Sequence, residues 1–247
     1  MKNNFLKPKL PYGFLLPFLK WSPQRKNQRP WVETSDRFFT ALHDADRLLP
    51  NIPVELLKEL VVTWGNSHWS AKEEYLAGMT QQAWESEGTI LECGSGLSTL
   101  ILALIARRKG QRLVTCEHVD SWAIAVQNAL DNFGLTNVEI VCTPLVSYGD
   151  FDWYRLPADT FREREISLVV CDGPPESTRG CRHGVLPVIM PFLRNGAVIL
   201  LDDVQAGGAT VLARWKREFG LGSVVEGSVK TYGRTVINLG ERDATAI

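Results

Sequence analysis

The pattern of hydrophobic and polar positions changes its period near residue 88. Before that point, apolar residues recur at helical spacing in three segments, which predicts helices over residues 35–49, 54–64 and 70–87. Ser70, followed by acids at Glu73 and Glu74, forms a capping-box pattern at the start of the third segment. We therefore expect residues 35–87 to form a helical cap, which would also border the substrate.

Beyond residue 88, short apolar runs alternate with helical segments. Strands are expected at 89–93, 112–117, 137–142, 166–171 and 196–201. Helices are expected at 97–109, 120–132, 182–194 and 207–219. Strands that are apolar throughout and alternate with helices predict a parallel sheet covered on both faces. Two further β-like runs, at 222–227 and 230–238, have a turn near Gly227 and no helix between them, which predicts an antiparallel pair at one edge.

Composition and charge divide the chain into three parts. Its 247 residues carry a net charge of -1, so nothing overall indicates a nucleic-acid partner. Residues 1–30 nevertheless hold seven basic residues and no acid. We interpret 1–34 as an extended basic arm, 35–87 as the helical cap and 88–247 as the ligand-binding domain. The arm could touch an anionic membrane surface, or pack on the domain or on a second copy of the chain in a homo-oligomer.

The cysteines and the apolar runs indicate the compartment. Five cysteines without a CxxC pair argue against a disulfide framework or a zinc knuckle, and buried reduced thiols are expected. No apolar run is long enough to span a bilayer, and the apolar patch at 14–19 lacks a small-residue cleavage site. A cytoplasmic protein is therefore expected.

Acidic residues end four of the five expected parallel strands, where open parallel sheets bind their ligands. Glu92 precedes the glycine loop Gly94-Ser95-Gly96, whose free N–H groups at a helix start suit a carboxylate, while Glu92 suits an ammonium group. Glu117 ends the next strand and could accept hydrogen bonds from both hydroxyls of a ribose, or cap the following helix. His118 and Trp122 could lie against a purine ring, and Trp122 could equally belong to the core.

Asp172, Asp202 and Asp203 end two strands that should be neighbours. Like charges so close need a cation or shifted pKa values, and Mg²⁺ with oxygen ligands would suit them. Alternatively, Asp202 or Asp203 caps the following helix and only Asp172 faces the ligand. In the loop after Asp172, His183 is a candidate general base or an exposed helix residue. Arg179 and Arg182 in that loop could bind an acidic substrate group or pair with nearby carboxylates.

Taken together, these motifs resemble the class I S-adenosylmethionine-dependent methyltransferases, over residues 70–240. The resemblance rests on Glu92-Cys-Gly-Ser-Gly, Glu117, Asp172-Gly-Pro-Pro and the segment 196–203 that ends in Asp-Asp. It implies a Rossmann-like fold with a seven-stranded, mostly parallel sheet, and methyl transfer to an oxygen atom of a small-molecule acceptor. Within the class, the aspartates are similar to the metal-dependent O-methyltransferases of the catechol and caffeoyl-CoA type and to bacterial methyltransferase-like proteins.

By the same resemblance, the cofactor-binding residues would be Glu92, Gly94, Ser95, Gly96, Ser98, Glu117, His118 and Asp172. Asp172 would lie near the sulfonium and act in catalysis. With Asp202 and Asp203, it would bind Mg²⁺. Two features depart from the catechol-type pattern: Pro175 stands where those enzymes place a lysine base, and the second metal pair is Asp-Asp.

Two rival functions remain open. An NAD(P)-binding Rossmann oxidoreductase would favour a third glycine where this chain has Thr99. A non-catalytic member would bind the cofactor or a partner without turnover.

We expect the aromatic segments 64–69 and 147–154 to form the acceptor pocket. Alternatively, these aromatic residues only pack within the fold.

Overall fold

The computed structural model describes residues 31–66, 69–226 and 231–238. Most of the expected arm over residues 1–34, and the turn expected near Gly227, lie outside these residues. Among the described helices, none is both long and apolar enough to cross a membrane.

Three helices precede the sheet, as the apolar spacing predicts: α2 (Trp31–Leu48), α3 (Val54–Trp64) and α4 (Glu73–Glu85). The capping-box prediction at Ser70 is wrong. Helix α4 begins at Glu73, its N-cap residue Lys72 makes no side-chain cap, and the Ser70 hydroxyl donates to the carbonyl of Asn66 at 2.9 Å. The hydroxyl therefore closes the preceding turn instead of capping the helix.

The central sheet has seven strands in the order β3-β2-β1-β6-β7-β9-β8. Their bounds are β1 (Thr89–Cys93), β2 (Leu113–Glu117), β3 (Val138–Cys142), β6 (Ile166–Cys171), β7 (Leu193–Leu201), β8 (Ser223–Glu226) and β9 (Tyr232–Val236). The first five in this order pair in parallel, and β9 pairs antiparallel with both β7 and β8. This confirms the predicted Rossmann-like sheet with its antiparallel C-terminal edge.

Helices α5 (Leu97–Lys109), α6 (Asp120–Asn132), α7 (Val185–Ile189) and α8 (Gly208–Phe219) connect the strands, with short 3-10 turns at η2 (Met190–Phe192) and η3 (Val204–Ala206). The helix expected over 182–194 is much shorter than predicted. Pro187 and Pro191 lack the N–H that a continuing helix needs, and β7 begins at Leu193. Between β3 and β6 the chain forms a hairpin of β4 (Leu145–Ser147) and β5 (Asp152–Tyr154).

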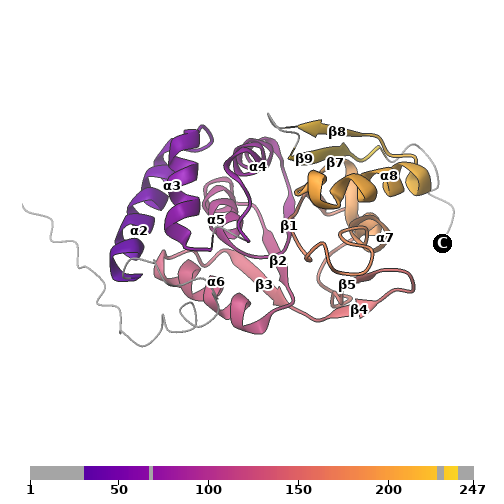
Figure 1. The fold of residues 1–247 in the computed structure, drawn as a ribbon, viewed down its shortest axis with the longest axis horizontal. Coiled ribbons are helices and arrows are strands. Elements are labelled where there is room, and N and C mark those ends of the chain that lie inside the picture. Colours follow the sequence, from indigo (N-terminus) through magenta and orange to yellow (C-terminus); the bar gives the residue numbers. More distant parts are fainter. Residues whose placement is uncertain (1–30, 67–68, 227–230, 239–247) are drawn as a thin grey trace, which may run out of the picture.

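Two hydrophobic layers enclose the sheet. Helices α2 to α6 pack on one face, through residues such as Leu42, Leu60 and Ile101. The β4–β5 hairpin, α7 and α8 cover the other face. Figure 1 shows α2 and α3 at one end of the molecule and the β8–β9 edge toward the other. The predicted two-sided covering is thus confirmed, and it leaves the carboxyl ends of β1, β2, β6 and β7 to form a common edge.

Candidate active site

The glycine loop joins β1 to α5 and touches the loop that follows β6. Gly94 has a φ of +87°, and a Cβ on this residue would lie 2.9 Å from the backbone nitrogen of Gly173. Position 94 therefore requires glycine for both its conformation and its space. A Cβ on Gly96, in contrast, would meet no atom within 4 Å. Gly96 therefore borders a space in which a ligand can approach the backbone.

Glu92 lies fully buried beneath this loop. Its Oε2 accepts hydrogen bonds from the hydroxyls of Thr99 at 2.7 Å and Thr115 at 2.8 Å, and Oε1 has no hydrogen-bond partner among the described residues. Burial raises the pKa of Glu92 to about 7, although neighbouring hydroxyls, including that of Ser98, oppose the rise. A buried carboxylate oxygen without a partner fits the ammonium group expected of the cofactor.

Glu117 ties the glycine loop to the end of β2. The backbone N–H and the hydroxyl of Ser95 both donate to Glu117 Oε2, and the N–H groups of His118 and Val119 donate to Oε1. Burial raises the pKa of Glu117, but these hydrogen bonds and the His118 side chain outweigh it and hold the pKa below its usual range. The side chain thus stays a carboxylate, as contacts to ribose hydroxyls would require, and it also caps the backbone before α6.

The two aromatic residues near Glu117 have different roles. The Trp122 indole donates to the carbonyl of Ser95 at 2.7 Å and packs edge-on against Trp64, with ring centroids 6.1 Å apart. Trp122 therefore supports the glycine loop from the helical side. The His118 ring is half-buried, with its centroid 6.1 Å from that of Tyr154. Its predicted place beside the adenine stays a prediction.

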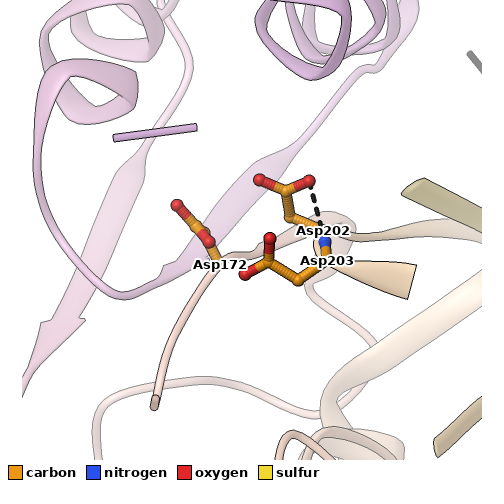
Figure 2. Close-up of side chains that lie close together, drawn as sticks. All are labelled: Asp172, Asp202 and Asp203. Carbon is orange, nitrogen blue, oxygen red and sulfur yellow. Dashed lines mark hydrogen bonds between the residues drawn. The ribbon is translucent and has the colours of Figure 1, made fainter. Parts of the chain in front are cut away.

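The three aspartates do come together, as Figure 2 shows. Asp172, Asp202 and Asp203, which we call the carboxylate cluster, each offer one oxygen within 4.8 Å of the others. Asp202 is buried, whereas the side chains of Asp172 and Asp203 are 21% and 49% exposed. Burial and the neighbouring Asp203 raise the pKa of Asp202 to about 6. Asp172 and Asp203 are therefore the carboxylates that an acceptor can reach.

A buried guanidinium accompanies the carboxylate cluster. Arg182 donates to Asp203 Oδ2 at 2.9 Å and to Asp172 Oδ1 at 3.2 Å. The sequence left open whether this arginine would bind a substrate or pair with carboxylates, and the structure shows the pairing. Since the guanidinium already binds two of the three side chains, the donor set does not fit the magnesium ion that the resemblance implies.

The fold does not place the His183 side chain at the carboxylate cluster. Its Nε2 lies 3.3 Å from Glu218 Oε2 on α8, and its ring packs edge-on against Phe151. It is also 2% exposed, so the alternative of an exposed helix residue is wrong. Burial lowers the pKa of His183. Its role as general base stays a prediction, and its surroundings do not favour it.

The aromatic segments expected to form the acceptor pocket contribute mainly to packing. Trp64, Trp153 and Tyr154 are buried in the two hydrophobic layers, and among the described aromatic residues of these segments only Trp69 and Tyr148 are well exposed. Arg179 pairs with Asp152 of the hairpin at 2.5 Å and thus supports the same layer. The cysteine prediction is confirmed at Cys93, Cys116 and Cys171, which are buried. It is wrong at Cys142, which is exposed, and Cys181 is only half-buried.

Sequence reasoning missed two of the residues that hold Glu92. In the sequence, Thr99 is notable only as the position where a third glycine is missing, yet its hydroxyl both donates to Glu92 and accepts from the N–H of Gly96 at 2.8 Å. The position of Thr99, one helical turn after the glycine loop, could have indicated that it contacts this loop. Thr115 is a single polar residue inside an apolar strand, which is a weak signal.

Comparisons with known proteins agree with this geometry. Residues 91–204 match a family model described as a methyltransferase domain. This match supports the predicted resemblance to the class I S-adenosylmethionine-dependent methyltransferases. The match begins inside β1 and ends just after the carboxylate cluster, so it spans all the strand ends described above. Among curated proteins, none matches this sequence.

Two solved structures share the fold of this chain. One is a methyltransferase from Podospora anserina with bound SAH, at 14% identity and a TM-score of 0.53, covering 85% of this chain and 97% of that one. The other is an O-methyltransferase from Bacillus cereus in complex with SAH, at 15% identity and a TM-score of 0.50, covering 83% of this chain and 100% of that one. At these identities the likeness concerns the fold.

Proposed function

We propose that this chain binds S-adenosylmethionine along the ends of β1 and β2 and transfers its methyl group to an oxygen of a small molecule. The observation that carries the proposal is Glu92, whose buried Oε1 has no partner in the described part of the chain. It lies beneath a glycine loop that borders an open space at Gly96. An amino acid joined to a nucleoside offers an ammonium group to Glu92 and ribose hydroxyls to Glu117.

The reaction is an in-line displacement at the sulfonium carbon, so the enzyme must align an acceptor and receive its proton. The half-exposed carboxylate of Asp203 and the partly exposed Asp172 can accept a hydrogen bond from an acceptor hydroxyl. This supports oxygen as the acceptor atom. The O-methyltransferase activity named for the Bacillus cereus protein of the same fold points in the same direction.

The oxidoreductase alternative is disfavoured by Thr99. In a dinucleotide-binding loop, the third glycine allows close packing of helix and strand. Here Thr99 stands at that position, and its hydroxyl bonds to Glu92 and to the N–H of Gly96. The loop is therefore organised around a buried carboxylate. A non-catalytic member would keep this loop, so binding alone does not separate it from an enzyme.

Calorimetric titration of the full chain with S-adenosylmethionine, and separately with NAD⁺, tests the cofactor. We expect a dissociation constant in the micromolar range for S-adenosylmethionine and no binding of NAD⁺. Transfer of a labelled methyl group to a panel of hydroxylated and amine-bearing small molecules then tests the acceptor, with EDTA in a parallel series. Binding of NAD⁺ alone would contradict the proposal, and cofactor binding without transfer to any acceptor would favour the non-catalytic alternative.

A further inference from the structure

Arg182 lies in the loop between β6 and α7, and its side chain enters the space between the ends of β6 and β7. It is 3% exposed. Besides its two carboxylate partners, the guanidinium donates to three backbone carbonyls, those of Asp172, Pro174 and Asp202. One side chain thus holds together the two strand ends that carry the cluster. Removing it would leave these carbonyls without a donor.

The charges explain why an arginine is stable there. The carboxylate cluster carries up to three negative charges at one edge of the sheet, and Figure 2 shows the three side chains gathered around a common centre. Burial alone would lower the pKa of Arg182, but the carboxylates of Asp172 and Asp203 raise it well above its usual range. The guanidinium therefore stays charged.

A divalent ion would have to share the carboxylates of Asp172 and Asp203 with this guanidinium. Mg²⁺ requires near-octahedral oxygen ligands at roughly 2.0–2.1 Å. Arg182 already binds one oxygen each of Asp172 and Asp203, and the N–H of Asp203 donates to Asp202 Oδ1 at 2.9 Å. An ion on the remaining oxygens would stand beside a buried positive charge that cannot lose its proton. Displacing the arginine would break its contacts to both strand ends.

We propose that Arg182 is the resident cation of the carboxylate cluster and takes the place there of a divalent metal ion. Its catalytic consequence, methyl transfer without a metal, rests on the proposed function. The binding claim does not, because cation binding is measurable on the protein without cofactor or acceptor. Arg182 acts as a positioning residue, because it holds the carboxylates of Asp172 and Asp203 in the orientation in which they face an acceptor.

Titration with Mn²⁺, followed by electron paramagnetic resonance and by calorimetry, tests the binding claim on the full chain. We expect the wild type to bind no Mn²⁺ up to about 1 mM, the weak end of oxygen-ligand sites. Arg182→Met keeps an unbranched apolar stem and removes the charged guanidinium, so this variant should bind Mn²⁺ at least tenfold more tightly. Arg182→Lys, which restores the charge, should again exclude the ion.

Arg179→Met is the matched control, because Arg179 lies in the same loop and pairs with Asp152 outside the carboxylate cluster. It should bind no more Mn²⁺ than the wild type. Wild-type binding well below 1 mM that Asp203→Asn abolishes would overturn the proposal, as would a folded Arg182→Met protein that gains no binding. If Arg182→Met does not fold, the wild-type and Asp203→Asn titrations decide alone: absence of binding in both supports a resident guanidinium.

Discussion

Ser95 gives two hydrogen bonds to a single oxygen of Glu117, one from its backbone N–H at 3.0 Å and one from its hydroxyl at 2.9 Å. The carboxylate at the end of β2 therefore fixes the glycine loop that follows β1. A ribose bound at Glu117 and an amino acid bound at the loop would be held by one connected unit. Such coupling predicts that changes at either residue weaken the same ligand.

Replacing Glu117 by alanine should weaken S-adenosylmethionine binding by roughly 100-fold, because the change removes the proposed ribose acceptor and releases the Ser95 loop. Ser95→Ala, which removes one hydroxyl bond and keeps the backbone one, should cost only about tenfold. Calorimetric titration measures both. Glu139→Ala is the control, since Glu139 is an exposed strand residue paired with Arg112. Unchanged affinity in Glu117→Ala would show that the ribose does not bind at this strand end.

The two loop glycines should respond differently to alanine. Gly94→Ala adds a Cβ that would lie 2.9 Å from the nitrogen of Gly173, at a φ of +87°, so it should destabilise the protein by about 2 kcal/mol or more. Gly96→Ala adds a Cβ that meets no protein atom within 4 Å. It should leave stability nearly unchanged and weaken cofactor binding at least tenfold.

Urea unfolding and calorimetric titration of both glycine variants separate these effects. The Gly96 variant serves as the control for general damage to the loop. If Gly96→Ala binds S-adenosylmethionine like the wild type, the cofactor does not approach the backbone at this position, and its placement along the loop must be abandoned.

The periodicity of the sequence predicts the sheet well, because the parallel strands are apolar throughout and each strand end is marked by a polar residue. The same reasoning places Asp172 beside Asp202 and Asp203, since neighbouring parallel strands end at one edge. It fails for α7, where Pro187 and Pro191 shorten a helix that the apolar spacing would extend.

The side-chain partners are harder to predict than the elements. Arg182 lies in an irregular loop after Asp172, and nothing in its spacing indicates that it turns back between two strands. His183, the next residue, points instead toward Glu218 on α8. Arg182 and His183 are thus consecutive in the loop but contact different parts of the fold. Their roles can be told apart only from the path of the backbone.

Glu92 predicts a pH dependence of stability. Its pKa rises from 4.5 to about 7 on folding, so the folded state holds its proton more tightly than the unfolded chain. This stabilising contribution is complete below pH 4.5 and is lost as the pH rises to about 7. Relative to Glu92→Gln, the wild type should lose about 3 kcal/mol of unfolding free energy over this range.

Urea unfolding of the wild type and of Glu92→Gln at several pH values between pH 4.5 and pH 8 measures this difference, without cofactor. Glu139→Gln is the control, because Glu139 lies at the surface. Curves for Glu92→Gln and the wild type that run parallel over the whole range would mean that Glu92 titrates normally and is not the buried, proton-holding group described above.

His183 offers the last test, because its surroundings predict a small catalytic effect. Its Nε2 faces Glu218 and its ring packs on Phe151, away from the carboxylate cluster. Once a methyl acceptor is found, His183→Gln should reduce kcat by less than about tenfold, well below the 10²–10⁴-fold contribution typical of a general base. Asp203→Asn should cost more, since its carboxylate is half-exposed beside Asp172. A loss above about 100-fold in His183→Gln, with unchanged unfolding free energy, would make this histidine the base after all.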